Sequence, residues 1–88
     1  MKVIMYTSGF CPFCMMAERL LRQRGVVDIH KIRVDLEPSQ REQMVAITGR
    51  RTVPQIFINE TYVGGYDELA TLDGVGGLLA LLEGKDNS

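Results

Sequence analysis

Two cysteines three positions apart are the residues of this chain best suited to chemistry. Cys11 and Cys14 are its only cysteines, and Pro12 and Phe13 separate them. A pair with this spacing can hold a metal ion, form a permanent disulfide, pack as two inert thiols or act as a reversible dithiol. The residues around the pair distinguish these roles.

Metal binding and inert packing are the weaker alternatives. A structural zinc site needs four ligands, and the chain offers one histidine, His30, and no third cysteine, so carboxylates would have to complete the set. Two thiols packed as small hydrophobic side chains are the other alternative. The pair stands with Pro12 between an apolar run and a helical pattern, which favours a redox dithiol over both.

A predicted helix gives the two cysteines different roles. Five apolar residues recur at the spacing of one helix face and predict a helix over residues 13–24, with Pro12 in the first turn: Phe13, Met16, Ala17, Leu20 and Leu21. Cys11 then lies at the N-terminus, where unpaired N–H groups and the helix dipole stabilise a thiolate. We expect Cys11 to attack a disulfide and Cys14 to resolve the mixed disulfide that forms.

The next elements alternate between strand and helix patterns. Residues 2–7 are a short, nearly continuous apolar run, typical of a strand buried on both faces. Residues 26–36 predict a second strand, with a bulge or irregular entry where the apolar phase slips between Ile29 and Ile32. Residues 39–42, SQRE, have the form of a capping box for a second helix that ends at Gly49. The core-facing residues expected on that helix are Met44, Val45 and Ile47.

The second half predicts a hairpin and a helical end. Residues 55–58 and 61–64 predict two strands across a turn at Asn59 and Glu60. Residues 67–73 and 77–83 predict helical pieces separated by the glycine-rich residues 74–77. The order β-α-β-α-β-β-α predicts an α/β fold with a four-stranded mixed sheet flanked by helices, because alternation requires a parallel pair and the hairpin adds an antiparallel edge.

Length and composition restrict the class of protein. With 88 residues, we expect one domain over residues 1–88, with residues 83–88 as a frayed tail. The net charge of −1 argues against nucleic acid or an anionic membrane as a partner. No apolar run approaches the length of a membrane span, and no signal-peptide pattern opens the chain. We therefore expect a reducing, cytoplasmic setting, in which a permanent disulfide is disfavoured.

Three motifs in order resemble the dithiol glutaredoxin family, most closely its short bacterial members. They are CPFC at residues 11–14, RTVPQIFI at 51–58 and GGYDEL at 64–69, and the resemblance extends from about Val3 to Leu82. It implies a thioredoxin-like fold and a site that binds glutathione. The implied glutathione-binding residues are Cys11, Phe13, Arg51, Thr52, Val53, Pro54, Gly65, Tyr66, Asp67 and Glu68.

The resemblance also implies how glutathione is held. A cis Val53–Pro54 bond would turn the backbone of Val53 toward glutathione, like one added strand residue. The N–H groups of Tyr66 and Asp67 would take the γ-glutamyl carboxylate, and Asp67 or Glu68 its ammonium. Plainer interpretations stay open: TVP as an ordinary strand start, Asp67 as a helix N-cap, and the two arginines at 50 and 51 as a solvated pair.

Two positions depart from the family pattern. Phe13 replaces a tyrosine, which keeps the ring and loses the hydroxyl. Ser8 stands where relatives commonly have a lysine that lowers the thiol pKa. We hypothesise that Arg50 or Arg51 partly replaces that charge and that glutathione is bound more weakly. The Met15–Met16 pair suggests copper only weakly, since Met16 is expected in the core and Met15 near solvent.

The sequence thus predicts a glutathione-dependent thiol–disulfide oxidoreductase without a metal. Its expected partners are glutathione and disulfide-bearing or glutathionylated proteins, with ribonucleotide reductase as a candidate client, and a monomer is expected. Two alternatives remain. One is an electron donor to ribonucleotide reductase fed by a thioredoxin reductase, and the other is a dimer that binds an iron–sulfur cluster.

Overall fold

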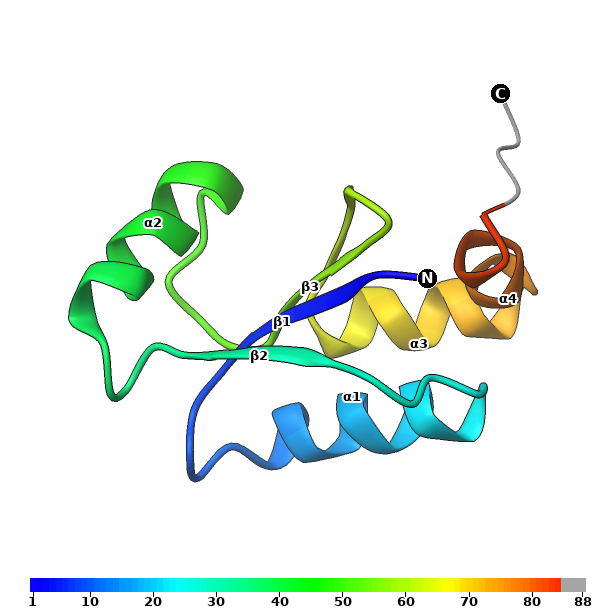
Figure 1. Ribbon diagram of the computed structural model, residues 1–88, viewed down its shortest axis with the longest axis horizontal. Helices are drawn as coiled ribbons and strands as arrows, with labels where there is room; N and C mark the ends of the chain where they lie inside the picture. Colours follow the sequence, from blue (N-terminus) through cyan, green and yellow to red (C-terminus); the bar gives the residue numbers. More distant parts are fainter. Residues whose placement is uncertain (85–88) are drawn as a thin grey trace.

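A computed structural model describes residues 1–84 of the chain (Figure 1). Its elements in chain order are β1 Val3–Thr7, α1 Pro12–Gln23, β2 His30–Arg33, α2 Pro38–Thr48, β3 Gln55–Ile58, β4 Thr61–Gly64, α3 Tyr66–Gly74 and α4 Gly77–Leu82. The predicted α/β fold, with its mixed four-stranded sheet, is confirmed.

The sheet has the strand order β2-β1-β3-β4. β1 pairs with β2 in parallel, from Ile4 opposite His30 to Thr7 opposite Arg33. β3 runs antiparallel to both β1 and β4. The predicted hairpin turn is present, and both Asn59 and Glu60 have positive φ angles, which suit the twist of a two-residue hairpin.

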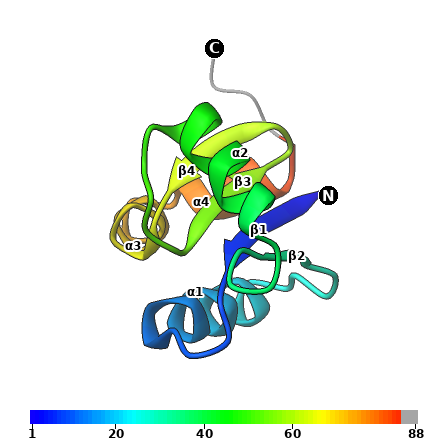
Figure 2. The same cartoon turned by 90° about the vertical axis from the view of Figure 1, so that its left-hand side faces the viewer.

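The two faces of the sheet are covered by different helices (Figures 1 and 2). Alternate residues of β1 point to opposite faces. Val3 and Met5 join a core cluster with residues of α1, α3 and α4, whereas Tyr6 packs with Met44 of α2 on the other face. The prediction that the first strand is buried on both faces is therefore confirmed.

Helix α1 buries a narrower face than its sequence suggests. Its buried residues are Cys14, Ala17 and Leu21. Met16 was expected in the core, and this is wrong, because 43% of its surface is exposed. The helix rests on the sheet along the line from Cys14 to Leu21, so Phe13 and Met16 fall at the edge of that contact.

Strand β2 is shorter than predicted. It covers His30–Arg33 instead of residues 26–36, and its pairing with β1 has no register shift. A bulge is therefore absent, but the alternative expectation of an irregular entry is confirmed, because residues 26–29 lead into β2 without regular structure. A register shift in the sheet lies instead between Ile56 and Phe57, where β3 pairs with β4. Val26 is not free to extend the strand, because its N–H bonds the carbonyl of Leu21 and its side chain is buried in the core beside α1.

Helix α2 begins two residues earlier than the predicted capping box places it, and it lacks that box. It starts at Pro38, and its N-cap residue, Glu37, makes no side-chain cap hydrogen bond. Proline fits the first helical position well, which moves the start ahead of Ser39. Only Met44 of the expected core face is buried, while Ile47 is 53% exposed, because one short helix covers this face of the sheet.

Helix α3 begins before the predicted cap. Gly65 is the N-cap residue, so the interpretation of Asp67 as N-cap is wrong. Gly64 and Gly65 let the chain turn tightly here: Gly64 has φ +118°, and a Cβ on Gly65 would lie 3.3 Å from the Pro54 carbonyl oxygen. The start of α3 therefore lies against the loop at Pro54.

The described part of the chain ends just after α4. Glu83 caps α4 and Gly84 follows in a turn, while the rest of the predicted frayed tail, residues 85–88, lies outside the described residues. No helix among residues 1–84 has the length and apolar character needed to cross a membrane.

Candidate functional site

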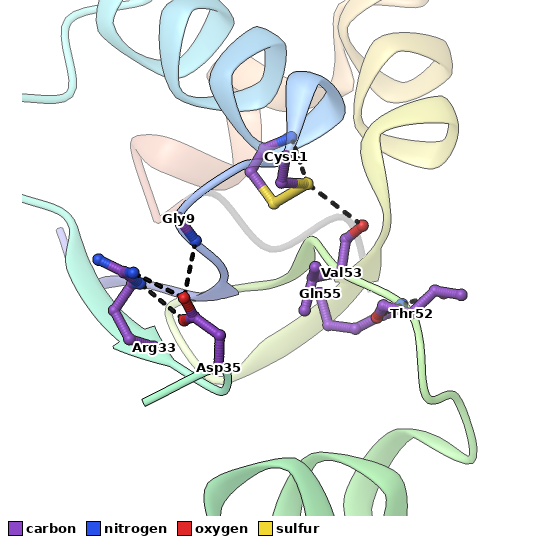
Figure 3. The surroundings of a disulfide bond; sticks show 8 residues. Gly9, Cys11, Arg33, Asp35, Thr52, Val53 and Gln55 are labelled. Carbon is purple, nitrogen blue, oxygen red and sulfur yellow. Dashed lines mark hydrogen bonds and ion pairs between the residues drawn. A yellow bond between two sulfur atoms is a disulfide. The ribbon is translucent and has the colours of Figure 1, made fainter. Parts of the chain in front are cut away.

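Cys11 is the N-cap residue of α1, as the sequence predicts. Its Sγ accepts a hydrogen bond from the backbone N–H of Cys14 at 3.2 Å, and the two cysteines form a disulfide (Figure 3). When the disulfide is reduced, the same N–H and the positive end of α1 face the sulfur of Cys11, and both stabilise a thiolate there. Cys14 lies within the first turn and has no such position.

The exposure of the two sulfurs does not by itself select the nucleophile. Cys11 keeps 9% of its surface exposed and Cys14 keeps 4%. Both residues are buried, and the difference is small. The assignment of Cys11 as the attacking residue therefore rests on its N-cap position.

A loop with a cis peptide bond faces Cys11. The Val53–Pro54 bond is cis, as the resemblance implies. The carbonyl oxygen of Val53 lies 3.7 Å from Sγ of Cys11 (Figure 3) and can accept a hydrogen bond from the reduced thiol. Gln55, the first residue of β3, donates from its side-chain Nε2 to the carbonyl of Thr52 at 3.0 Å. The loop is thus held from the sheet and directed at the cysteines.

A groove of about 290 Å³ runs beside this loop. Its lining residues are Phe13, Arg50, Thr52, Val53, Pro54, Gln55, Gly65, Tyr66, Asp67 and Glu68. The rings of Phe13 and Tyr66, with centroids 6.1 Å apart, connect the start of α1 to the start of α3. Eight of the ten residues implied by the resemblance line the groove together.

Two of the implied residues do not line this groove, and two others do. Cys11 borders it through Val53, and Arg51 is exposed, with its backbone carbonyl accepting a hydrogen bond from Arg41. Arg50 and Gln55 line the groove in addition. Gln55 was missed because a glutamine at the start of a strand pattern gives no sign of which way its side chain folds.

Arg50 and Glu68 form an ion pair across one end of the groove. Nη1 of Arg50 lies 2.6 Å from Oε1 of Glu68, and the same oxygen accepts the N–H of Gly65 at 2.8 Å. The bond from Gly65, and then the Arg50 guanidinium, hold the pKa of Glu68 below its usual value. A carboxylate is therefore fixed at the start of α3, while Asp67, one residue earlier, is exposed to solvent.

A second ion pair holds the loop before Cys11. Asp35 accepts the N–H of Gly9 at 3.1 Å and binds Arg33 through both carboxylate oxygens (Figure 3). The sequence contains one sign of this contact that was not used. Gly9 and Asp35 follow the neighbouring parallel strands β1 and β2, and the carboxyl ends of parallel strands meet at one edge of a sheet.

A larger surface depression lies elsewhere. About 800 Å³ in volume, it runs between β4 and the helices α3 and α4, and neither cysteine lines it. The smaller groove is the better candidate, because it adjoins the disulfide and combines backbone donors with a fixed carboxylate. Among residues 1–84 there is no cluster of three or more metal-ligating side chains.

Comparison with known proteins gives a family match, a similar relative and a similar solved structure. Residues 3–63 match the family model described as Glutaredoxin. A glutaredoxin of Neisseria meningitidis serogroup A is 52% identical over 80 residues, which cover 91% of this chain and 94% of the relative. The solution structure of a glutaredoxin from Brucella melitensis has a TM-score of 0.84 at 38% identity, covering 99% of this chain and 94% of that one.

A third comparison concerns a protein with its ligand. The crystal structure of a buckwheat glutaredoxin–glutathione complex has a TM-score of 0.86 at 26% identity. It covers 94% of this chain and 77% of the buckwheat chain. The overall fold described above is therefore similar to that of glutaredoxins from a bacterium and a plant.

Proposed function

Because the chain belongs to the glutaredoxin family of thiol–disulfide oxidoreductases, we propose that it uses glutathione to reduce glutathione mixed disulfides and protein disulfides. One observation carries the proposal most directly. Sγ of Cys11 accepts the N–H of Cys14 at the start of α1 and lies 3.7 Å from the carbonyl of Val53. The N-terminus of α1 would thus stabilise the thiolate of Cys11, and the backbone of the loop before Pro54 lies beside its sulfur.

Removal of glutathione from a protein requires only Cys11. Its thiolate attacks the glutathione sulfur of the mixed disulfide, the old S–S bond breaks, and the protein thiolate leaves and takes a proton. Cys11 then carries glutathione. The thiolate of a second glutathione attacks that glutathione sulfur, which releases glutathione disulfide and restores the Cys11 thiolate.

Reduction of a protein disulfide requires both cysteines. Cys11 attacks one sulfur, and the other leaves as a thiolate and is protonated. Cys14 then attacks Cys11 in the mixed disulfide, which releases the reduced protein and forms the Cys11–Cys14 disulfide. That oxidised state is the one present in the structure. Two molecules of glutathione supply the two electrons that return the pair to the dithiol.

We place glutathione in the groove beside Pro54. Its cysteine backbone would pair with the N–H and C=O of Val53, and its γ-glutamyl carboxylate would meet the N–H groups of Tyr66 and Asp67 at the start of α3. We assign its ammonium to Asp67, since Glu68 already bonds Gly65 and Arg50. The similar buckwheat glutaredoxin, whose crystal structure is a complex with glutathione, supports this class of ligand.

Protein clients would approach from the side of the cysteines that glutathione leaves open. Phe10, directly before Cys11, is fully exposed, and it does not line the groove. An exposed aromatic ring beside a nucleophile is a contact that a protein surface can bury and that a small tripeptide in the groove does not need. A reducing compartment such as the cytoplasm suits this chemistry.

A coupled assay with glutathione, glutathione reductase and a small glutathione mixed disulfide tests the proposal. We expect Cys14→Ser to retain deglutathionylation and to lose reduction of protein disulfides, while Cys11→Ser loses both by more than about a hundredfold, as for removal of a catalytic nucleophile. Activity that survives in Cys11→Ser would contradict the mechanism.

The same protein preparation distinguishes the two alternatives. Reduction by thioredoxin reductase that is faster than reduction by glutathione would favour the role of a thioredoxin-like electron donor. A brown dimer with the absorbance of an iron–sulfur cluster after anaerobic purification would favour the cluster-binding role. We expect a colourless monomer that is reduced by glutathione.

A further inference from the structure

Gln55 is a buried polar side chain directly after the cis proline. Only 1% of its surface is exposed. Its Nε2 donates to the carbonyl of Thr52 at 3.0 Å, with Oγ1 of Thr52 at 3.5 Å, and its Oε1 accepts the hydroxyl of Tyr62 at 2.5 Å. Both ends of the amide therefore have partners, as a buried amide requires.

The position does not need a polar residue for packing. Phe57, the next residue on the same face of β3, is apolar and packs against the core cluster of Tyr6, Val34 and Met44. An apolar side chain at residue 55 would avoid the cost of burying an amide. The glutamine can do what an apolar residue cannot, because it donates a hydrogen bond to the backbone of the loop before Pro54.

That hydrogen bond orients the backbone of Val53. The carbonyl of Thr52 and the N–H of Val53 belong to one planar peptide unit, and in a trans unit they point in opposite directions. Gln55, the first residue of β3, binds the carbonyl of Thr52 (Figure 3), so the N–H of Val53, on the other side of the same peptide unit, points away from the Gln55 amide. The carbonyl of Val53 faces Sγ of Cys11.

Tyr62 holds the Gln55 amide from the neighbouring strand. The carbonyl of Thr52 only accepts hydrogen bonds, so Nε2 must face it and Oε1 must face Tyr62. Tyr62 lies on β4, and its ring packs on Phe57 of β3 with centroids 5.1 Å apart. The sheet thus holds the hydroxyl of Tyr62 in place. The three hydrogen bonds of the Gln55 amide, two to Thr52 and one to Tyr62, connect β4 to the loop before Pro54.

We propose that Gln55 and Tyr62 are positioning residues that hold the Thr52–Val53 peptide in the orientation that pairs with the backbone of bound glutathione. This inference rests on the proposed function. Neither residue touches the reacting sulfurs, so the pair acts on the affinity for the glutathione part of a substrate and not on the Cys11 thiolate.

Two substitutions remove different bonds of this network. Gln55→Glu keeps an acceptor for Tyr62 but cannot donate to Thr52, and Tyr62→Phe keeps the bond to Thr52 but frees Oε1 of Gln55. For a small glutathione mixed disulfide we expect KM to rise about tenfold in Gln55→Glu and about threefold in Tyr62→Phe, with kcat within about twofold of the wild type.

A matched control and two further readouts separate positioning from general destabilisation. Tyr6→Phe removes a phenol hydroxyl from another ring that contacts Phe57, and it should leave KM unchanged. The alkylation rate of Cys11 against pH should give the wild-type thiol pKa in all variants. The amide resonance and hydrogen exchange of Val53 should change in Gln55→Glu and Tyr62→Phe but not in Tyr6→Phe.

The outcomes are distinct. A wild-type protein whose turnover does not depend on glutathione would refute the proposed function itself. A glutathione-dependent wild type with an unchanged KM in Tyr62→Phe and Gln55→Glu would refute the positioning role alone. If Gln55→Glu does not fold, the comparison of Tyr62→Phe with Tyr6→Phe decides, and equal KM values in those two variants would overturn the inference.

Discussion

Asp35 is a carboxylate outside the groove that holds the loop before Cys11 in place. It joins Arg33, at the end of β2, to the N–H of Gly9, two residues before Cys11. The guanidinium of Arg33, and next the N–H of Gly9, hold the pKa of Asp35 well below its ordinary value of 3.8. The pair is exposed, so salt screens its effect on stability.

The pH dependence of this contact has a definite sign. A carboxyl whose pKa is lower in the folded state contributes stability above its unfolded value of 3.8, and loses it as the pH falls toward its folded value. We expect Asp35→Asn to be less stable than the wild type at pH 6, with the difference shrinking below about pH 4. Denaturant unfolding at a series of pH values from 6 to about 2 measures this.

Two results would show that this account of Asp35 is wrong. One is a stability difference between Asp35→Asn and the wild type that stays constant over the acid range. The other is an effect at pH 6 that does not weaken when salt is added, since an exposed ion pair is screened. Asp28→Asn is a suitable control, because it makes the same substitution at an acid on the loop before β2.

Helix α3 presents two neighbouring acids with different surroundings. Glu68 accepts the N–H of Gly65 and so completes the backbone hydrogen bonding at the helix start, besides pairing with Arg50. Asp67 is exposed at the groove. Glu68 therefore stabilises the helix, and Asp67 is the better candidate for the ammonium of glutathione.

Substitution of each acid separates these two roles. We expect Asp67→Asn to raise KM for a glutathione mixed disulfide about threefold to tenfold without a loss of stability, because one charged hydrogen bond to the ligand is lost. We expect Glu68→Ala to lower the free energy of unfolding by about 1 kcal/mol through loss of the cap contact. Steady-state kinetics and denaturant unfolding of both variants give the two quantities.

The opposite effects on KM would assign the ammonium of glutathione to Glu68 instead of Asp67. If KM rises in Glu68→Gln, in which the amide oxygen can still accept the N–H of Gly65, and stays constant in Asp67→Asn, then Glu68 binds the ligand. Glutathione would in that case have to displace Arg50 from Glu68.

The whole molecule consists of one sheet between two unequal cores. The larger core unites β1 and β3 with α1, α3 and α4, and it includes Ala17 and Leu21 of α1. The smaller core contains Tyr6, Val34 and Met44 under α2. Because the same sheet lies between them, we expect the chain to unfold as the single domain predicted from its length.

One large-to-small substitution in each core tests whether the chain unfolds in a single cooperative transition. We expect Leu21→Ala, beneath α1, to cost about 3–5 kcal/mol of unfolding free energy, and Met44→Ala, beneath α2, about 2–3 kcal/mol, because the half-exposed surroundings of α2 can relax into the space. Calorimetry and circular dichroism measure both. Two separate transitions in either variant would show that the two faces unfold independently.

The order of the elements could be predicted because its signals are local. The bounds of β3 and β4 are those expected from the sequence, since Pro54 and the Asn59–Glu60 turn delimit two short apolar runs. The start of α1 followed from Pro12 and the period of its apolar residues. The predicted bounds are wrong where contacts with another element decide them. Strand β2 ends where its pairing with β1 ends, and Val26 lies outside the strand because its N–H bonds the carbonyl of Leu21 in α1.

The chemistry that we propose for this protein could be predicted from its sequence, because two cysteines three residues apart at a helix start suit a nucleophile and its resolving partner. The arrangement around them could not. The contacts of Gly9 with Asp35, Arg50 with Glu68, and Tyr62 with Gln55 join residues between 7 and 26 positions apart, and they exist only after the strands pair and α3 closes on the loop. Hydrogen bonds between distant segments depend on the packing of the whole chain, and no local spacing specifies them.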